Sequence, residues 1–399
     1  MLQCYIDNRN VGLKHLQPSA KDLEHGLDLH KNSLVWDAYG FSPNGPVDGA
    51  LADDLIDKGV YPEDFTDAME RYRQTEFLRN PNYQKVYAEL WEYAGVNCIF
   101  QNSGVEGNRP DLMIKRFSNY LYNTDKYPNL VRRAAFPHQV EQAFKDNVPA
   151  LYFTTNGVPL PYPLNSASEA FRYLDVFYHL GTRMMHLSYN RHNLLGGGCG
   201  EKSDMGLTEL GRAVIEKMNE IGIIVDVAHS SQQTSFEAAK ASSKPMVASH
   251  TVAGGLSSHC RAKNDQTCKA IADTGGYIGV CMVPRFLRRS GDINAFIDHL
   301  DYLIKLVGPD HVAVGTDTAA WCDEFIPQTK KYSVKTGVID SIWPSEDYVE
   351  TDEMYQSLCW TNWPLITVGL VMRGYSDEDI QKVIGLNVLR VTKEVLTDI

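Results

Sequence analysis

The 399-residue chain lacks the features that define several classes of protein. No apolar run reaches the roughly 18–20 residues that cross a bilayer, and neither end reads as a signal or anchor segment. We therefore expect no membrane partner and a cytoplasmic location. The eight cysteines include no CxxC pair, so we expect reduced thiols rather than a disulfide framework.

Positive charge is also scarce in this chain. There are 38 Lys and Arg against 50 Asp and Glu, and the formal net charge is −12. Such a surface repels phosphate backbones, which argues against nucleic acid as a partner. The hydrophobic content of 43% is enough for a large core. Without an internal repeat, low-complexity tract or linker, the sequence predicts one domain over residues 1–399, with insertions at about 40–95 and 318–362.

Eight apolar segments of strand length alternate with helical patterns along the chain. Continuous apolar runs are typical of parallel strands that are buried on both faces. The alternation predicts an α/β fold, a (β/α)8 barrel of the TIM type. An open doubly wound sheet is the alternative, but WDAYGFSPNG after the first strand lacks the GxGxxG turn. The predicted strands are 34–39, 96–102, 148–156, 183–189, 222–228, 245–249, 276–283 and 312–317.

Helices are predicted from apolar residues at helical spacing. The clearest are 206–221 and 292–307. Another is predicted around 82–94 within the first insertion, and helices close the chain from residue 363 onward. Ser376 is expected to cap one of these, with Asp379 completing a capping-box-like start. Both insertions come after the C-terminal ends of strands, where they are either a roof over the barrel mouth or ordinary surface loops.

Polar side chains stand at the C-terminal ends of six predicted strands. In a closed barrel these ends meet at one mouth, where α/β barrels carry their chemistry. Two imidazoles and a carboxylate can hold one zinc ion there. Without metal, they can act as general acid and base, because imidazole titrates near neutral pH. The six residues are Tyr39, Asn156, Tyr189, His229, His250 and Asp317.

Three further signals receive a structural interpretation. His186 is expected to point away from the mouth if Tyr189 points into it, because side chains alternate along a strand. Glu106 follows the second predicted strand and lies too far before Tyr189 to belong to the third, so we leave it out of the site. In the alternative in which Glu106 does belong to the site, Glu106, His229 and His250 form a one-zinc site. The run LLGGGCG at 194–200 predicts a tight turn rather than a phosphate site.

Motifs in the second half of the chain carry a family resemblance. They are HLGTRMMHLSYNRHN (179–193), GLTELGRAVIEKMNEIGIIVDVAHSS (206–231), PMVASHTVAGGLSSHCR (245–261), GPDHVAVGTD (308–317) and RGYSDEDIQKVIGLNVLRV (373–391). In this combination the chain resembles the renal (membrane) dipeptidases, zinc peptidases with an amidohydrolase-like barrel. The resemblance implies an α/β barrel and a binuclear zinc site that cleaves dipeptides.

The family pattern implies a role for each strand end. Strand 1 ends in His-x-Asp and strand 3 supplies a bridging Glu, strands 5 and 6 supply two His, and the strand-8 Asp handles the proton. His229, His250 and Asp317 match this pattern. The strand-1 positions are instead Tyr39 and Phe41, neither of which replaces a zinc ligand.

Two more positions complete the comparison with the family pattern. Asn156 stands at the strand-3 position where the family has the bridging Glu. Arg261 stands where the family binds the substrate carboxylate, which a planar guanidinium does with two hydrogen bonds.

These residues lead to one hypothesis and two alternatives. We expect an enzyme without a cofactor that acts on a small amino-acid-like or carboxylate-bearing molecule, with no binuclear zinc site. Its catalytic residues are His229, His250, Asp317 and Tyr39, and its substrate-binding residues are Arg261, Tyr189 and Asn156. The alternatives are a one-zinc dipeptidase or amidase with His229, His250 and Asp317 as ligands, and a non-catalytic binding protein. A homodimer is implied by the resemblance alone.

Overall fold

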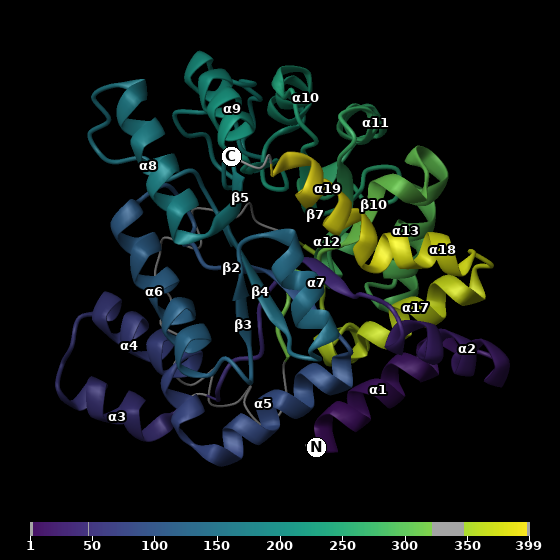
Figure 1. Ribbon diagram of the computed structural model, residues 1–399. Coiled ribbons are helices and arrows are strands. Elements are labelled where there is room, and N and C mark those ends of the chain that lie inside the picture. The colour runs from purple at the N-terminus through teal and green to yellow at the C-terminus, as the bar shows by residue number, and fades with distance from the viewer. Residues whose placement is uncertain (1–2, 47, 321–346, 397–399) are drawn as a thin grey trace.

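The computed structural model describes residues 3–46, 48–320 and 347–396. Ten described strands form one parallel sheet, and eight of them are arranged in the order β1-β2-β4-β5-β6-β7-β9-β10 (Figure 1). The short strands β3 and β8 pair beside this path, on β4 and β7. The bounds are β1 Trp36–Gly40, β2 Cys98–Asn102, β3 Arg132–Ala134, β4 Ala150–Thr155, β5 Thr182–His186, β6 Ile224–Asp226, β7 Val247–Ala253, β8 Ala262–Lys263, β9 Tyr277–Val280 and β10 Val312–Val314.

Backbone and side-chain hydrogen bonds close the sheet between its first and last strands. Just after β10, the amide of Asp317 donates to the carbonyl of Tyr39 over 3.0 Å. The Asp37 carboxylate of β1 accepts from the Thr316 amide over 2.9 Å and from the Thr316 hydroxyl over 2.6 Å. The eight predicted strands therefore all form, and the prediction of a (β/α)8 barrel is confirmed. The sequence did not predict β3 and β8.

Helices surround the strands and cover the outer face of the barrel (Figure 1). The predicted helices at 82–94, 206–221 and 292–307 are confirmed as α5, α9 and α13. The described helices are α1 Gln3–Leu16, α2 Ala20–Lys31, α3 Gly49–Asp57, α4 Pro62–Gln74, α5 Pro81–Ala94, α6 Pro110–Lys126, α7 Pro137–Lys145, α8 Ala167–Leu180, α9 Glu209–Ile221, α10 Gln232–Ala241, α11 Asp265–Asp273, α12 Pro284–Leu287, α13 Ile293–Val307, α16 Asp352–Ser357, α17 Trp363–Met372, α18 Asp377–Gln381 and α19 Asn387–Val395.

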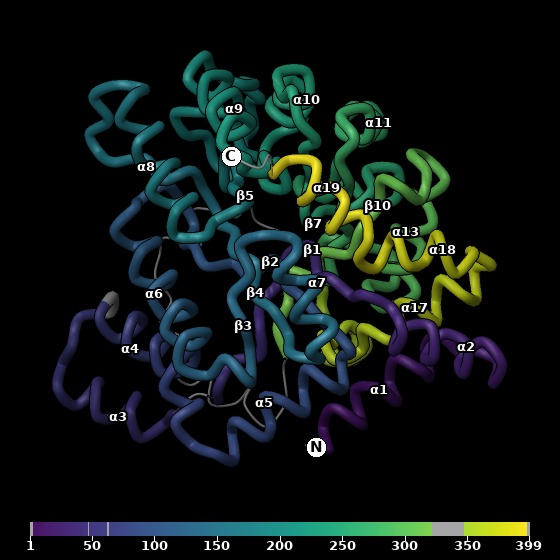
Figure 2. Tube along the Cα trace, in the orientation of Figure 1, coloured from purple at the N-terminus to yellow at the C-terminus, as the bar shows by residue number. Residues whose placement is uncertain are grey.

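The C-terminal helices pack beside the start of the chain. Helix α17 lies against α2, as the purple and yellow parts of the trace show (Figure 2). The Ser376 hydroxyl accepts from the amide of Asp379 over 3.2 Å at the start of α18, so the predicted cap is confirmed. Between α18 and α19 the chain forms one turn of π-helix, Lys382–Leu386.

Every second residue of neighbouring strands belongs to one buried cluster. Its large members include Trp36, Phe100, Tyr152 and Met184. The Trp36 ring stacks on Phe100 at a centroid distance of 5.5 Å and meets the edge of Tyr152 at 5.2 Å. Because side chains alternate between the two faces of a strand, these residues fill the barrel interior. Val388 and other residues of α19 pack against the same cluster.

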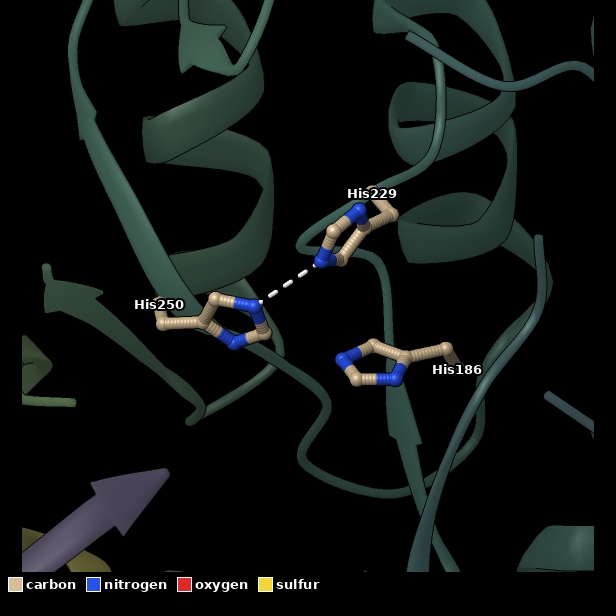
Figure 3. Close-up of side chains that lie close together, drawn as sticks. All are labelled: His186, His229 and His250. Carbon is tan, nitrogen blue, oxygen red and sulfur yellow. Dashed lines mark hydrogen bonds between the residues drawn. The ribbon is translucent and has the colours of Figure 1, made fainter. Parts of the chain in front are cut away.

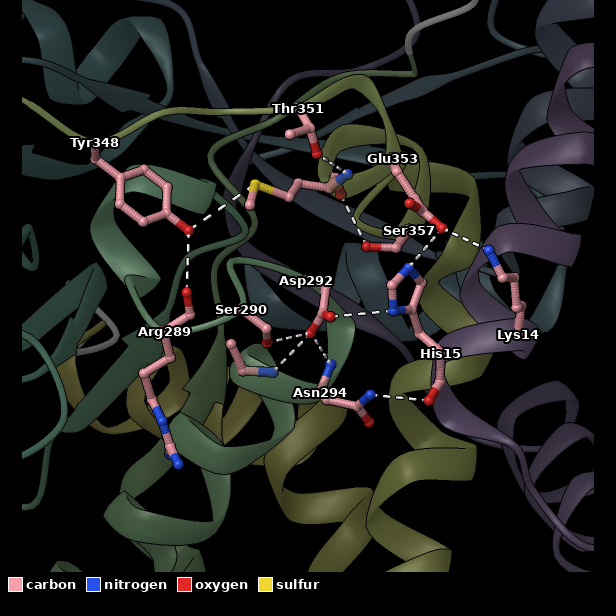
Figure 4. A network of polar contacts seen from close by, with 12 residues as sticks. Lys14, His15, Arg289, Ser290, Asp292, Asn294, Tyr348, Thr351, Glu353 and Ser357 are labelled. Carbon is pink, nitrogen blue, oxygen red and sulfur yellow. Dashed lines mark hydrogen bonds and ion pairs between the residues drawn. The ribbon is translucent and has the colours of Figure 1, made fainter.

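The first insertion contributes α3, α4 and α5. Much of the second, 321–346, lies outside the described residues. A polar network ties residues 348–357 and the start of α13 to the N-terminal helix α1 (Figure 4). Lys14 contacts Glu353 over 2.9 Å, and the two ring nitrogens of His15 contact Asp292 over 3.1 Å and Glu353 over 3.3 Å. Asp292 also accepts from the amides of Asn294 and Ala295 at the start of α13.

Two sequence expectations concern the chain's environment. Among the described residues, none of the helices has the length and apolar character that a bilayer crossing requires. Cys98, Cys199, Cys260, Cys268, Cys281 and Cys359 are free thiols, but Cys4 is in a disulfide bond. The expectation of reduced thiols is therefore wrong for Cys4.

Candidate active site

Three imidazoles converge inside the C-terminal end of the barrel (Figure 3). His186 is the last residue of β5, His250 lies within β7, and His229 follows β6 by three residues. All three side chains are buried. One ring nitrogen of each lies within 4.8 Å of those of the other two. This cluster is the chemical centre of the mouth.

His186 was expected to point away from the mouth, and that prediction is wrong. Strand β5 ends at His186, so the alternation counted backwards from Tyr189 ran through residues that are not in a strand. Met184 lies in the interior cluster, and His186, two residues further on, shares its face. An interior Met184 is the signal that would have placed His186 correctly. The cluster contains His186, whereas the sequence had named Asp317 as the third ligand.

His229 and His250 face each other through their Nε2 atoms, which lie 3.0 Å apart. Nδ1 of His229 lies 2.7 Å from Oδ1 of Asn190, and Nδ1 of His250 lies 2.7 Å from Oγ of Ser249. Because an amide oxygen only accepts, Nδ1 of His229 carries the proton and its Nε2 offers a lone pair. Burial, together with the positive charge of Arg261, lowers the pKa of both imidazoles well below 6.5. Both rings are therefore neutral at pH 7.

The third imidazole has a different partner. Nε2 of His186 lies 2.9 Å from Oδ2 of Asp226, and both side chains are fully buried. Nδ1 of His186 has no hydrogen-bond partner among the described residues. Oδ1 of Asp226 accepts from the amides of Ala228 and Ser249. Burial favours a higher pKa for Asp226, but the neighbouring His186 and the hydrogen bonds hold that pKa below its usual value.

Asn190, which the sequence did not single out, orients His229. Its backbone is left-handed, with φ of 56°, a conformation that Asn adopts more readily than most residues. Gly198 packs against it so closely that a Cβ would lie 2.1 Å from the Asn190 carbonyl carbon. The glycine run at 194–200 therefore serves close packing around the site, as the prediction of a tight turn implies.

Two tyrosine rings lie flat on the facing imidazoles. The Tyr39 ring stacks on His250 at 3.7 Å between centroids, and the Tyr189 ring stacks on His229 at 3.9 Å. Tyr39 is fully buried, and Tyr189 is partly exposed. Burial raises the pKa of both phenols well above 10, and the nearby carboxylates of Asp317 and Glu106 raise it further. Both hydroxyls stay protonated at neutral pH.

The Tyr39 hydroxyl donates to Oδ1 of Asn156 over 2.5 Å. Asn156 directly follows β4, the third strand of the barrel, which is where the sequence placed it. Its amide nitrogen lies 3.4 Å from Oε1 of Glu106. Glu106 follows the second barrel strand, as predicted, and lies beside Asn156 at the mouth.

Asp317 follows β10 with a left-handed backbone, φ 55°. Burial raises the pKa of its carboxyl to about 6, although the positive charges of Arg261 and Arg285 and the nearby His186 oppose that change. The side chain keeps some solvent exposure. A carboxyl that titrates so close to neutrality can both take and return a proton.

Arg261 was predicted to bind the substrate carboxylate. Its side chain is fully buried. Nη2 donates to the His250 carbonyl over 2.7 Å, and Nε donates to the Ala228 carbonyl over 3.2 Å. In this structure the guanidinium therefore fixes the backbone beside the histidines, and its charge acts on the mouth from behind them. Carboxylate binding by Arg261 stays a prediction.

Two cysteines at the edge of the site differ in acidity. A hydrogen bond from Cys260 lowers the pKa of Cys199 to about 7, against the effect of burial and with help from Arg261 and Lys263. The same contact and burial raise the pKa of Cys260. Sγ of Cys199 lies 3.3 Å from Oδ1 of Asn190, the residue that holds His229. Of the two thiols, Cys199 is therefore the more acidic.

The donors around the histidines decide how many metal ions fit. A metal pair needs bridging or terminal carboxylates to balance its charge. At the positions that the resemblance assigns to such ligands, the chain has Tyr39, Phe41 and Asn156. The Tyr39 hydroxyl is bonded to Asn156 and its ring covers His250. The residues present do not fit a metal pair, whereas the three imidazoles fit a single ion.

Fold and site together define a (β/α)8-barrel protein with a histidine-rich mouth. The family model of the membrane dipeptidases, peptidase family M19, matches residues 79–327. This is more than half of the chain, so the protein belongs to the membrane dipeptidase family. The resemblance seen in the sequence is confirmed, and membership of a peptidase family supports the expectation of an enzyme.

Individual curated relatives match only part of the chain, at 25–33% sequence identity. An uncharacterized protein in the pqqA 5′ region of Klebsiella pneumoniae is 33% identical over 158 residues, 37% of this chain and 58% of that protein. Dipeptidase tcpJ of Claviceps purpurea is 25% identical over 227 residues, 56% of this chain and 47% of that protein. The matches thus span about half the length of these curated relatives.

A solved structure shows the same fold over nearly the whole chain. The amidohydrolase from Pseudomonas aeruginosa superposes with a TM-score of 0.69 at 22% identity, covering 93% of this chain and 99% of that one. At this identity the likeness concerns the fold alone.

Proposed function

We propose that this protein is a dipeptidase-type enzyme that acts on a small, amino-acid-like molecule with a carboxylate, and that it works without a pair of zinc ions. The observation that carries the proposal is the bond between Tyr39 and Asn156. It joins two positions at which the family resemblance implies metal ligands, and it leaves the two histidines and Asp317 in place. Membership of the dipeptidase family supports the hydrolase class.

Proton transfer is assigned to Asp317. Its pKa of about 6 leaves it ionised at neutral pH and able to accept a proton from an attacking water. His229 and His250 are less suited to donating a proton, because their lowered pKa values keep them neutral. Their lone pairs instead suit the binding of a substrate proton or of one metal ion. A single ion held by the imidazoles would polarise an amide carbonyl.

A carboxylate on the substrate is favoured by the charge at the mouth. Arg261 and Arg285 both act on Asp317 electrostatically, and a buried guanidinium is screened less than an exposed one. The substrate carboxylate would lie toward these cations. Tyr189, which is partly exposed and covers His229, would form one wall for the rest of the molecule. Asn156 offers a further polar contact.

The proposal is tested with dipeptides, N-acyl amino acids and the corresponding amides as substrates. We expect turnover of at least one class, reduced by roughly 10²–10⁴-fold in Asp317→Asn, as loss of an acid–base group does. Metal analysis of the same preparation should give no more than one ion per chain. Two tightly held zinc ions would overturn the proposal. If these compounds bind to the wild-type protein but none of them is turned over, the result would favour the non-catalytic alternative.

A further inference from the structure

We propose that His186, His229 and His250 together form a mononuclear site for a late first-row divalent metal such as zinc or cobalt, with His186 as the third ligand. The inference rests on the proposed function in one respect, because the metal site and the proposed catalytic residues both lie at the C-terminal end of the barrel. What is new is the role of His186 and Asp226, which the family pattern in the sequence does not include.

The three rings are arranged almost symmetrically. Their centroids are separated by 5.0 Å for His229 and His250, and by 5.3 Å from His186 to each of the other two. The interplanar angles are 61°, 76° and 77°. The three separations are thus nearly equal, and no two of the rings are stacked. All three also turn toward a common point (Figure 3).

These separations match those of imidazoles around one ion. A ring that binds zinc at roughly 2.0–2.1 Å has its centroid about 3.2 Å from the ion, and three such rings at tetrahedral angles have centroids about 5.2 Å apart. The ligand nitrogens would then be about 3.3 Å apart. The Nε2 atoms of His229 and His250 are at 3.0 Å. The widest nitrogen separation in the cluster stays within 4.8 Å, so an ion at the centre would draw these nitrogens closer together.

Each imidazole has a neighbour that orients it. Asn190 and Ser249 hold the Nδ1 atoms of His229 and His250, and the two Nε2 atoms contact each other over 3.0 Å, a contact that a bound ion would replace. Groups of this kind fix the tautomer and ring orientation of metal-binding histidines. Asp226 lies beside His186 and supplies a buried negative charge close to the cluster. It would act as a positioning residue and balance part of the charge of the ion.

His186 is the least satisfied member of the cluster. It is fully buried, its Nε2 contacts the Asp226 carboxylate over 2.9 Å, and its Nδ1 has no hydrogen-bond partner among the described residues. A buried polar group without a partner is destabilising. A metal ion bound by His186 would add a second polar partner to this ring, beside the Asp226 carboxylate.

The donor chemistry selects the class of metal. Three imidazole ligands suit Zn²⁺, Co²⁺, Ni²⁺ and Cu²⁺, whereas Mg²⁺ and Ca²⁺ prefer oxygen ligands. The site therefore takes a borderline transition-metal ion. Three protein ligands leave a fourth position of a tetrahedral ion for water or substrate.

The test uses the full chain after chelation and titrates it with Co²⁺ alone. We expect one equivalent to bind, with the visible absorption of low-coordinate cobalt. In His186→Asn the affinity should fall by more than about 100-fold, since changes to orienting groups alone cost about 10–100-fold. Asp226→Asn should weaken binding by about that smaller factor. His30→Asn is the matched control, because His30 is also buried but bonds to Thr367 and Ala94 away from the cluster.

X-ray absorption on the zinc-loaded wild type covers the case in which His186→Asn fails to fold. Three imidazole ligands support the inference, and two overturn it. A wild type that binds no cobalt, or a His186→Asn variant that binds it equally well, also overturns it. These outcomes are separate from the proposed function. Substrate turnover without metal binding refutes only the metal site, and metal binding without turnover refutes only the enzyme proposal.

Discussion

The Tyr39 hydroxyl donates a 2.5 Å hydrogen bond to Asn156 across the mouth of the barrel. Tyr39 is the last residue but one of the first barrel strand and Asn156 directly follows the third, and the family resemblance implies metal ligands at both positions. A carboxylate at position 156 would be a buried charge without a metal to balance it, whereas an amide can accept a phenol hydrogen. The replacements at the two positions therefore form one interaction.

Tyr39→Phe should destabilise the protein by about 1–3 kcal/mol, because it leaves the buried Asn156 oxygen without its donor. The free energy of unfolding from urea titration measures this. Tyr162→Phe is the matched control, since Tyr162 is 96% exposed and should change stability by less than about 0.5 kcal/mol. Equal stability of Tyr39→Phe and wild type would contradict the assigned role of the bond.

Asp317 should set the acid limb of the pH profile. Its pKa of about 6 means that the ionised, proton-accepting form is lost as the pH falls through that value, so kcat/KM should rise from pH 5 to pH 7 and then level off. Asp317→Asn should abolish this limb. Asn is the suitable replacement because the position has a positive φ that Asn tolerates. A limb that persists in Asp317→Asn would show that another group accepts the proton.

Asp37 should make stability depend on pH in the opposite sense to most carboxyls. Burial raises its pKa from 3.8 to about 7, against the effect of the hydrogen bonds from Thr316 and Trp360. The folded state then keeps a proton that the unfolded state loses, so this contribution is full below pH 3.8 and is lost as the pH rises toward 7.

The effect of Asp37 on stability is measured by comparing the unfolding free energies of wild type and Asp37→Asn across pH. At 1.36 kcal/mol for each unit of pKa, the loss is on the order of 4 kcal/mol between pH 4 and pH 7. The unfolding free energy of wild type should therefore fall by this amount relative to Asp37→Asn, which does not titrate. Parallel pH profiles for the two proteins would show that the Asp37 carboxyl has no raised pKa.

Cys199 should react with iodoacetamide faster than any other described free thiol. Its pKa of about 7 gives a substantial thiolate fraction at pH 7.5, while the pKa of Cys260 is raised. Peptide mass spectrometry after brief labelling identifies the modified residue. Cys260→Ala removes the hydrogen bond that stabilises the thiolate and should slow the labelling of Cys199. Preferential labelling of Cys260 in wild type would reverse the assignment.

The strand order was readable from the chain because a buried parallel strand needs an unbroken apolar run. The runs ending near His229, His250 and Asp317 each became a barrel strand or its exit. The short strands β3 and β8 were missed, since two or three residues carry no periodic signal. The disulfide at Cys4 was missed because isolated cysteines do not indicate their partners.

The site was only partly readable for a different reason. His186 was misplaced because the end of β5 could not be located to within a residue, and one residue reverses the direction of a side chain. Asp226 stands inside the apolar run IGIIVDVAHS, and a carboxylate in such a run is a signal that a buried partner exists. Asn190 and Ser249 do not stand out from their local sequence in this way, so the sequence gives no signal for their contacts with the histidines.

The sequence by itself determined the fold class, the order of the strands and the kinds of donor available at the barrel mouth, because these depend on local apolar patterns and residue identity. Only the tertiary structure decided that three imidazoles meet, and that Tyr39 bonds to a residue 117 positions away. Contacts of that range are set by the closure of the barrel, which brings separate strand ends to distances that no local pattern encodes.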